Sequence, residues 1–157
     1  MKKYIYIPFN FSPFCKLLER LLNHARTDIV TIPLHFFDAV QGAHWQNEKF
    51  KGGTRVVDWF NEYTASLMFV NASFFKSNYK DKVEFDGALP CGEDIKYICT
   101  ILSEKMTLGL VAKPTYFYRR RSVGEESLIQ SSKKKVSWYF DYFTHLIDWG
   151  VEFAYNK

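Results

Sequence analysis

The sequence predicts an α/β fold with a mixed sheet, flanking helices and an aromatic-rich helix near its C-terminal end. Short stretches rich in β-branched and aromatic residues, such as 28–34 and 115–120, are typical of strands. Longer segments at 93–105 and 134–153 are typical of helices, the first because its apolar residues recur at helical spacing. The 157 residues, 47% of them hydrophobic, are enough for one core and too few for two ordinary domains.

The first part of the chain is expected to hold two strands with a helix between them. Tyr4–Pro8 alternates aromatic and β-branched residues, which predicts a strand. Leucines at helical spacing after Ser12-Pro13 predict a helix over Phe14–His24. The run Asp-Ile-Val-Thr-Ile-Pro-Leu predicts one buried strand over Asp28–Leu34.

The middle of the chain is expected to be less regular. Residues 38–54 are predicted to form a loop that ends in Lys-Gly-Gly-Thr. Arg55–Phe60 is predicted to form a short apolar element. Ser66–Lys76 is expected to begin as a strand or turn and to continue as a helix.

The remaining part is predicted to alternate helices and strands. The elements, in order, are a helix at 93–105, strands at Leu108–Ala112 and Thr115–Arg120, a polar loop at 122–132, and a helix at Lys134–Phe153. We therefore expect one domain over residues 1–133, with a helical segment of residues 134–157 packed on it.

An acidic pair, Glu93 and Asp94, follows the loop residue Gly92 at the start of the helix predicted over 93–105. A carboxylate in the first helical turn is favoured by the helix dipole, and beside a loop it can act as a general base. The alternative is that the pair only caps and charge-matches the helix. The apolar face of this helix is predicted to comprise Ile95, Ile98, Cys99 and Leu102.

Four segments, taken in order, carry a resemblance to a known family. They are Ser-Leu-Met-Phe-Val-Asn-Ala-Ser-Phe-Phe-Lys at 66–76, Val-Glu-Phe-Asp-Gly at 83–87, Leu-Pro-Cys-Gly-Glu-Asp at 89–94, and Gly-Leu-Val-Ala-Lys-Pro-Thr-Tyr-Phe-Tyr-Arg-Arg-Arg at 109–121. This order resembles the second half of the catalytic domain of family 2 glycosyltransferases, which have the Rossmann-like GT-A fold. The resemblance covers roughly residues 28–143 and is densest over 66–121.

The resemblance implies inverting, hexosyltransferase-type transfer of a sugar from a nucleotide-sugar donor to a saccharide acceptor, commonly in bacterial surface-polysaccharide synthesis. Such a reaction needs a carboxylate to remove the proton of the acceptor hydroxyl, and positive charge to neutralise the leaving diphosphate. Asp94 matches the base, and Glu93 matches a companion that orients the loop or the acceptor. A divalent metal, Mg or Mn, is expected for the complete enzyme, but this chain offers no secure cofactor ligands.

The same resemblance implies that the strand predicted at 115–120 and the loop after it approach the diphosphate. The matching residues are Arg119 or Arg121 at the end of the strand and Ser122 or Ser127 in the loop. Strand geometry places Arg119 and Arg121 on one face and Arg120 on the other. The alternative is that these arginines form only a solvated strand end.

The sequence also departs from the family. It contains no Asp-x-Asp motif, which in complete members holds the metal and the sugar nucleotide. We therefore expect a partial GT-A domain that carries the acceptor side, lacks the donor-binding half and is inactive as an isolated chain. Sheet edges that the missing strands would cover favour self-association, or a partner that supplies them. The alternative function is a non-catalytic remnant or interaction module.

Composition excludes several other classes of protein. The net charge of +4 is modest and no nucleic-acid-binding motif is present, so no nucleic-acid partner is expected. Three cysteines without C-x-x-C spacing suggest neither a disulfide framework nor a zinc site. No apolar run is long enough to span a bilayer, so a cytoplasmic location is expected. Lys133–Lys135, followed by the aromatic C-terminal helix, leave open a peripheral contact with the inner face of the membrane.

Overall fold

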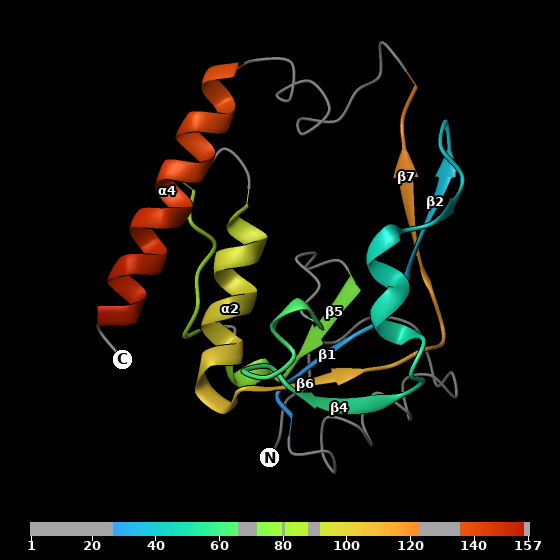
Figure 1. Ribbon diagram of the computed structural model, residues 1–157, viewed down its shortest axis with the longest axis horizontal. Coiled ribbons are helices and arrows are strands. Elements are labelled where there is room, and N and C mark those ends of the chain that lie inside the picture. The colour runs from blue at the N-terminus through green and yellow to red at the C-terminus, as the bar shows by residue number, and fades with distance from the viewer. Residues whose placement is uncertain (1–26, 66–71, 80, 88–91, 123–135, 156–157) are drawn as a thin grey trace.

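The computed structural model describes residues 27–65, 72–79, 81–87, 92–122 and 136–155 (Figure 1). Within these ranges the chain forms two sheets and two α-helices, so the predicted mixed α/β class is confirmed. The first sheet has the strand order β4-β6-β1-β5, and the second has the order β3-β2-β7. The strand predicted at Tyr4–Pro8 and the helix predicted at Phe14–His24 lie outside the described residues.

The first sheet lies at the base of the molecule in Figure 1 and provides much of the buried core. Its strands are β1 (Ile29–Thr31), β4 (Arg55–Asp58), β5 (Ser73–Phe75) and β6 (Thr107–Leu110). β1 runs parallel to β6 and antiparallel to β5, and β4 runs antiparallel to β6. Gly109 of β6 pairs with Val30 of β1, and a Cβ atom at position 109 would lie 2.8 Å from Cγ2 of Val30. The close approach of these two strands therefore requires glycine.

The second sheet extends the first. Its strands are β2 (Leu34–Asp38), β3 (Gly42–Ala43) and β7 (Tyr116–Arg120). β2 follows β1 and β7 follows β6, each after a short break that contains a proline, which has no N–H to donate to a ladder. The bonds beside the breaks remain, because Val111 N donates to Thr31 O (3.0 Å) and Tyr116 N donates to Pro33 O (2.8 Å). One parallel pair of chain segments therefore runs through both sheets.

The prediction of a single strand over Asp28–Leu34 was wrong in its extent. The chain breaks at Ile32-Pro33, and the two parts join different sheets as β1 and β2. The helix predicted within Ser66–Lys76 was also wrong for residues 73–75, which form β5. The backbone of β5 pairs with β1, and this long-range pairing determines its conformation.

The loop predicted over residues 38–54 contains regular structure that the sequence pattern did not reveal. It includes β3 and a 3₁₀ helix, η1 (Trp45–Phe50). His44 caps the start of η1, because its Nδ1 accepts a hydrogen bond from Gln46 N at 3.2 Å. Phe50 at the end of η1 is buried in the core.

The helix predicted at residues 93–105 is confirmed as α2 (Glu93–Lys105). Its buried face consists of Tyr97, Ile98, Cys99, Ile101 and Leu102, which extends the predicted face and leaves Ile95 half-buried. The helix ends at Met106, which adopts the left-handed conformation (φ 56°) and donates its N–H to Leu102 O at 2.7 Å. α2 therefore packs on the first sheet and turns directly into β6.

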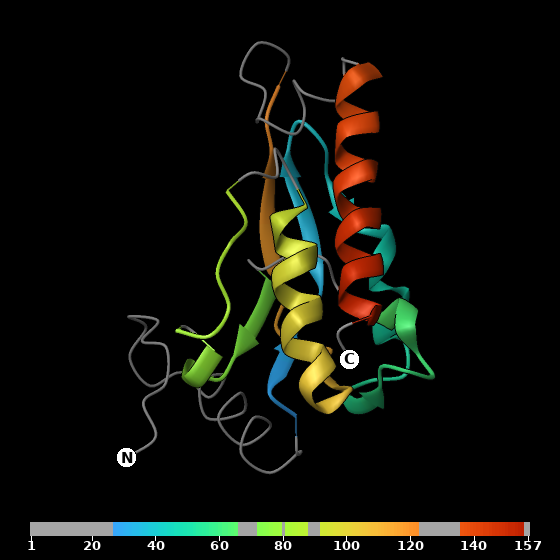
Figure 2. The ribbon, with the colours of Figure 1, turned by 90° about the vertical axis from the view of Figure 1, so that its left-hand side faces the viewer.

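The C-terminal helix is α4 (Val136–Tyr155), which begins and ends two residues later than predicted. It lies beside α2 in both views (Figures 1 and 2). Four large apolar side chains at helical spacing remain exposed on it: Phe140, Phe143, Ile147 and Val151. In the part of the chain that the structure describes, neither this helix nor any other has the length and apolar content needed to cross a membrane.

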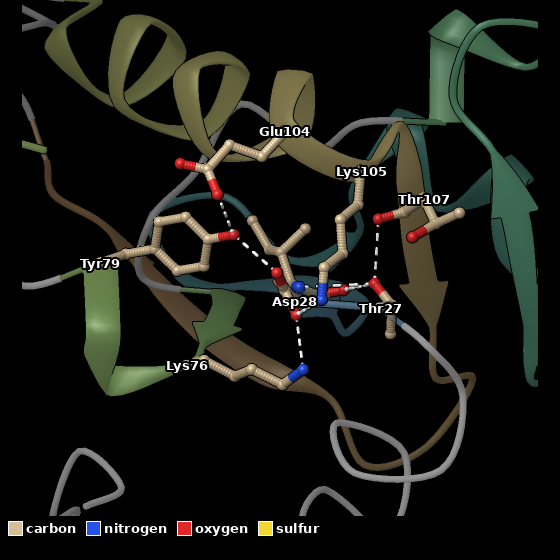
Figure 3. Close-up of polar contacts among 8 residues, drawn as sticks. Thr27, Asp28, Lys76, Tyr79, Glu104, Lys105 and Thr107 are labelled. Carbon is tan, nitrogen blue, oxygen red and sulfur yellow. Dashed lines mark hydrogen bonds and ion pairs between the residues drawn. The ribbon is translucent and has the colours of Figure 1, made fainter. Parts of the chain in front are cut away.

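A buried carboxylate joins the N-terminal end of β1 to the C-terminal end of α2 (Figure 3). The Oδ1 atom of Asp28 accepts hydrogen bonds from Nζ of Lys76 (2.5 Å) and Nζ of Lys105 (2.8 Å). Its Oδ2 atom lies 2.6 Å from the hydroxyl oxygen of Tyr79, which is also 2.9 Å from Oε2 of Glu104. A hydroxyl has one hydrogen, so Tyr79 donates to one of these carboxylates at a time. We call these five residues the Asp28 network.

The network shifts the pKa values of its members. Burial alone would raise the pKa of the Asp28 carboxyl, but hydrogen bonds from Lys105, Lys76 and Tyr79 outweigh burial and hold this pKa below its ordinary value. Burial and the two neighbouring carboxylates raise the pKa of the Tyr79 hydroxyl. Asp28 is therefore ionised and Tyr79 neutral at neutral pH.

Replacing Asp28 tests how much this network stabilises the fold. We expect Asp28→Asn to lower the free energy of unfolding by about 2 kcal/mol, because charge-assisted hydrogen bonds at a buried site are lost. Urea denaturation followed by circular dichroism measures this change. The matched control is Glu48→Gln, which removes an exposed ion pair with Lys51 and should change stability little. Equal losses of unfolding free energy in the two variants would show that the Asp28 network stabilises the fold no more than an exposed ion pair does.

The stabilising effect of Asp28 should depend on pH in a defined direction. Its pKa in the folded protein lies below the ordinary value of 3.8, so the folded state favours the ionised form. The extra stability is therefore complete above the unfolded-state pKa and is lost as the pH falls through the folded-state pKa. We expect the difference in unfolding free energy between wild type and Asp28→Asn to shrink below about pH 4. A difference that stayed constant or grew on acidification would contradict this assignment.

Candidate functional site

The predicted acidic pair lies at the end of α2 that is remote from the Asp28 network. α2 rises from the first sheet on the same side as the second sheet, as both ribbon views show (Figures 1 and 2). Glu93 and Asp94 are the first two residues of the helix and are both half-buried. Two carboxylates therefore occupy the turn in which the helix dipole favours negative charge.

The local backbone explains why the helix begins at Glu93. Gly92 adopts the left-handed conformation with φ of 83°, which glycine tolerates without steric cost. Its carbonyl oxygen accepts hydrogen bonds from Ile95 N (3.0 Å) and Lys96 N (3.2 Å). As the N-cap residue, Gly92 has no side chain with which to cap the helix.

Glu93 has an unusual environment for a carboxylate. Its Oε2 atom is buried and has no hydrogen-bond partner in the described part of the chain. A buried acceptor without a donor is costly, so native structures contain few of them. This oxygen could accept a hydrogen bond from a bound hydroxyl group.

Segment 81–87 is fixed against α2 by two kinds of contact. The Lys96 ammonium group is 2.6 Å from Oδ2 of Asp86. The ring of Tyr97 stacks on Phe85 with centroids 4.5 Å apart and planes at 7°, and its centroid lies 5.3 Å from that of Phe75. These contacts fix the position of α2 close to its acidic start.

The arginines predicted to meet a diphosphate lie on the second sheet. The alternation predicted along this strand is confirmed, since Phe117 and Arg119 are exposed and Tyr116, Tyr118 and Arg120 are half-buried. The Nε atom of Arg119 donates to Oδ2 of Asp38 at 2.7 Å, which ties the ends of β2 and β7 together.

The other predicted contacts follow the strand. Arg121 and Ser122 come directly after β7 and are exposed. Ser127 lies outside the described residues. The structure thus places the acidic pair at the start of α2, Arg119 on β7 and Arg121 directly after β7.

An aromatic cluster beside β2 was missed by the sequence reasoning. His44 is buried, and its ring lies between Phe36 (centroids 5.0 Å apart) and Trp45 (5.5 Å, stacked). The guanidinium carbon of Arg120 is 5.6 Å from the centroid of the Phe36 ring. Burial, together with the positive charges of Lys49 and Arg120, lowers the pKa of His44. His44 therefore acts as a neutral packing residue, and the nearby His35 instead contacts Phe117.

Comparison with known proteins gives two related sequences and no matching family model. The minor teichoic acid biosynthesis protein GgaB of Bacillus subtilis (strain 168) is 35% identical over 112 residues, which are 71% of this chain and 12% of that protein. The minor teichoic acid biosynthesis protein GgaA of the same strain is 29% identical over 136 residues, 83% of this chain and 29% of that protein. This chain is thus related in sequence to parts of two teichoic acid biosynthesis proteins, and it spans less than a third of the length of either.

Proposed function

We propose that this chain carries the acceptor side and the catalytic base of an inverting GT-A glycosyltransferase of family 2 that acts in the synthesis of a surface polymer. The observation that carries the proposal is the acidic pair Glu93 and Asp94 at the start of α2. The names of the two relatives support the polymer class, because both are minor teichoic acid biosynthesis proteins. The mixed α/β fold is compatible with part of a Rossmann-like domain.

In the proposed reaction the acceptor hydroxyl oxygen attacks the anomeric carbon of the donor sugar. A new C–O bond forms as the bond from that carbon to the diphosphate oxygen breaks, and the bonding electrons leave with the nucleoside diphosphate. The hydroxyl proton passes to the carboxylate of Asp94, which acts as general base. Glu93 orients the acceptor, and its buried Oε2 atom is suited to accept a hydrogen bond from a second acceptor hydroxyl.

The leaving diphosphate would be met by residues at the end of β7. Arg119 is engaged with Asp38, so it would have to exchange that carboxylate for a phosphate oxygen. Arg121 and Ser122 lie one and two residues beyond the strand, and with Ser127 they complete the proposed set. A guanidinium group suits this role because it presents a fixed fork of donors to phosphate oxygens.

The Mg or Mn ion of the family reaction does not fit the part of this chain that the structure describes. No group of three or more His, Cys, Asp or Glu side chains in those ranges could hold a metal ion. The 157 residues also contain no Asp-x-Asp motif. No step of the proposed reaction depends on a metal ion held by the described residues. We propose that a partner segment or chain supplies the donor-binding residues, and that the isolated chain lacks transfer activity.

The exposed side chains of α4 favour a second function, which is attachment to a membrane surface. Phe140, Phe143, Ile147 and Val151 form an apolar stripe along the helix, and each is at least half exposed. Lys133–Lys135 immediately precede the helix in the sequence and would suit anionic lipid headgroups. Asp141 and Asp148 are acidic and also exposed, so we expect apolar insertion to dominate over charge attraction.

The catalytic assignment predicts a large loss of activity for Asp94→Asn. Asparagine keeps the size of the side chain but cannot take the acceptor proton, so the transfer rate should fall about 10²- to 10⁴-fold. The measurement is release of nucleoside diphosphate from a panel of sugar nucleotides, in the assembly that shows transfer. Glu93→Gln should cost less, because Glu93 orients and does not take the proton.

Two controls keep this test specific. Thermal unfolding should show that Asp94→Asn remains folded, and Glu48→Gln, at an exposed position on η1, should keep full activity. Equal activity of Asp94→Asn and wild type would remove Asp94 as the base. It would leave dipole matching as the role of the acidic pair.

The membrane function predicts that the apolar stripe carries vesicle binding. In co-sedimentation with vesicles of phosphatidylcholine and phosphatidylglycerol, the double change Phe140→Ser and Ile147→Ser should weaken binding more than about tenfold, because two apolar side chains no longer insert. Phe60→Ser is the matched control, since Phe60 is 75% exposed in the turn after β4, away from α4. Equal sedimentation of the double variant and wild type would reject membrane attachment through α4.

A further inference from the structure

A pocket of about 170 Å³ lies between α2, α4 and segment 81–87. Both ribbon views show α4 alongside α2 (Figures 1 and 2). The pocket is lined by Asp86, Lys96, His145, Asp148, Trp149 and Glu152. The sequence reasoning did not find it, because its residues come from three segments that are distant along the chain.

The pocket has an excess of negative charge. It contains three carboxylates and one ammonium group, and Lys96 is engaged with Asp86 at 2.6 Å. Asp148 and Glu152 make no hydrogen bond or ion pair with any residue that the structure describes. Two carboxylates are therefore available to hydrogen-bond donors that enter the pocket.

Trp149 lines the pocket from α4 and is half-buried. A sugar ring has an apolar C–H face and a rim of hydroxyl groups. An indole ring packs well against such a face, and carboxylates accept strong hydrogen bonds from hydroxyl or ammonium groups.

We propose that this pocket binds one sugar unit of the acceptor, either neutral or bearing an amino group, and excludes phosphate-bearing units. Phosphate would meet the uncompensated charges of Asp148 and Glu152. This inference rests on the proposed function, because it names the acceptor chemistry of the same site. Lys96 lies one helical turn after Glu93, on the same side of α2, so the pocket adjoins the acidic start of the helix.

The test uses three probes that differ in one substituent: glucose, glucosamine and glucose 6-phosphate. Binding to the full chain is measured by NMR titration of the tryptophan indole signals at near-neutral pH. We expect glucosamine to bind about fivefold more tightly than glucose, because the two carboxylates attract its ammonium form. Glucose 6-phosphate should bind at least about fivefold more weakly than glucose.

Three variants assign the binding to the pocket. Trp149→Ala should weaken the binding of glucose and of glucosamine alike by about tenfold, since the indole ring proposed to pack against the sugar is removed. The double change Asp148→Asn and Glu152→Gln keeps size and should abolish the preference for glucosamine over glucose. Asp141→Asn is the matched control: it removes one charge from α4 outside the pocket and should change nothing.

The outcomes separate this inference from the proposed function. The pocket assignment is overturned if the three probes bind equally, if none binds, or if the double variant keeps the preference. An Asp94→Asn variant with full transfer activity would reject the proposed reaction but leave a measured sugar preference in place. If Asp94→Asn loses transfer activity but none of the three probes binds to the chain, only the pocket assignment is rejected.

Discussion

The carboxylate of Asp28 is the interaction on which the placement of α2 depends. It lies at the start of β1 and joins that strand to η4 (Ser77–Tyr79) and to the last turn of α2. A 13-residue helix is a rigid rod about 20 Å long. A helix that is fixed at its C-terminal end by Lys105 and along its face by the core has little freedom at the other end. The position of Glu93 and Asp94 is therefore largely determined by contacts at the opposite end of α2 and along its buried face.

The second constraint is the parallel pair that runs from the first sheet into the second. The breaks at Pro33 and Pro114 fall beside one another, so both chain segments change sheet together. β2 and β7 leave the first sheet in register, and the ion pair between Asp38 and Arg119 closes the far end of the ladder. The candidate acidic residues at the start of α2 and the candidate basic residues at the end of β7 thus lie on two elements that both extend from the first sheet.

The sequence was informative where local chemistry determines structure. The glycine before Glu93, the acidic first turn and the apolar spacing predicted α2 with its observed bounds. It was less informative where distant contacts decide, as at residues 73–75, which form a strand because they pair with β1. The cap formed by His44 and the pocket beside Trp149 depend on three-dimensional neighbours that no local pattern encodes. For the candidate site, the sequence indicated the carboxylates Glu93 and Asp94 but not the pocket between α2 and α4.

The close contact between Gly109 and Val30 makes the middle of β6 intolerant of substitution, although no side-chain polar interaction is made at position 109. A methyl group at position 109 would meet Cγ2 of Val30 at 2.8 Å and Cγ2 of Thr27 at 3.3 Å. Thr27 is followed by Asp28, so a wider gap between these strands would disturb the network that fixes α2. A mutational scan should rank this glycine with the charged residues of the network, although it has no side chain. The short distance between β1 and β6 depends on the absence of a Cβ atom at Gly109. This distance thereby also affects the position of the acidic turn at the opposite end of α2.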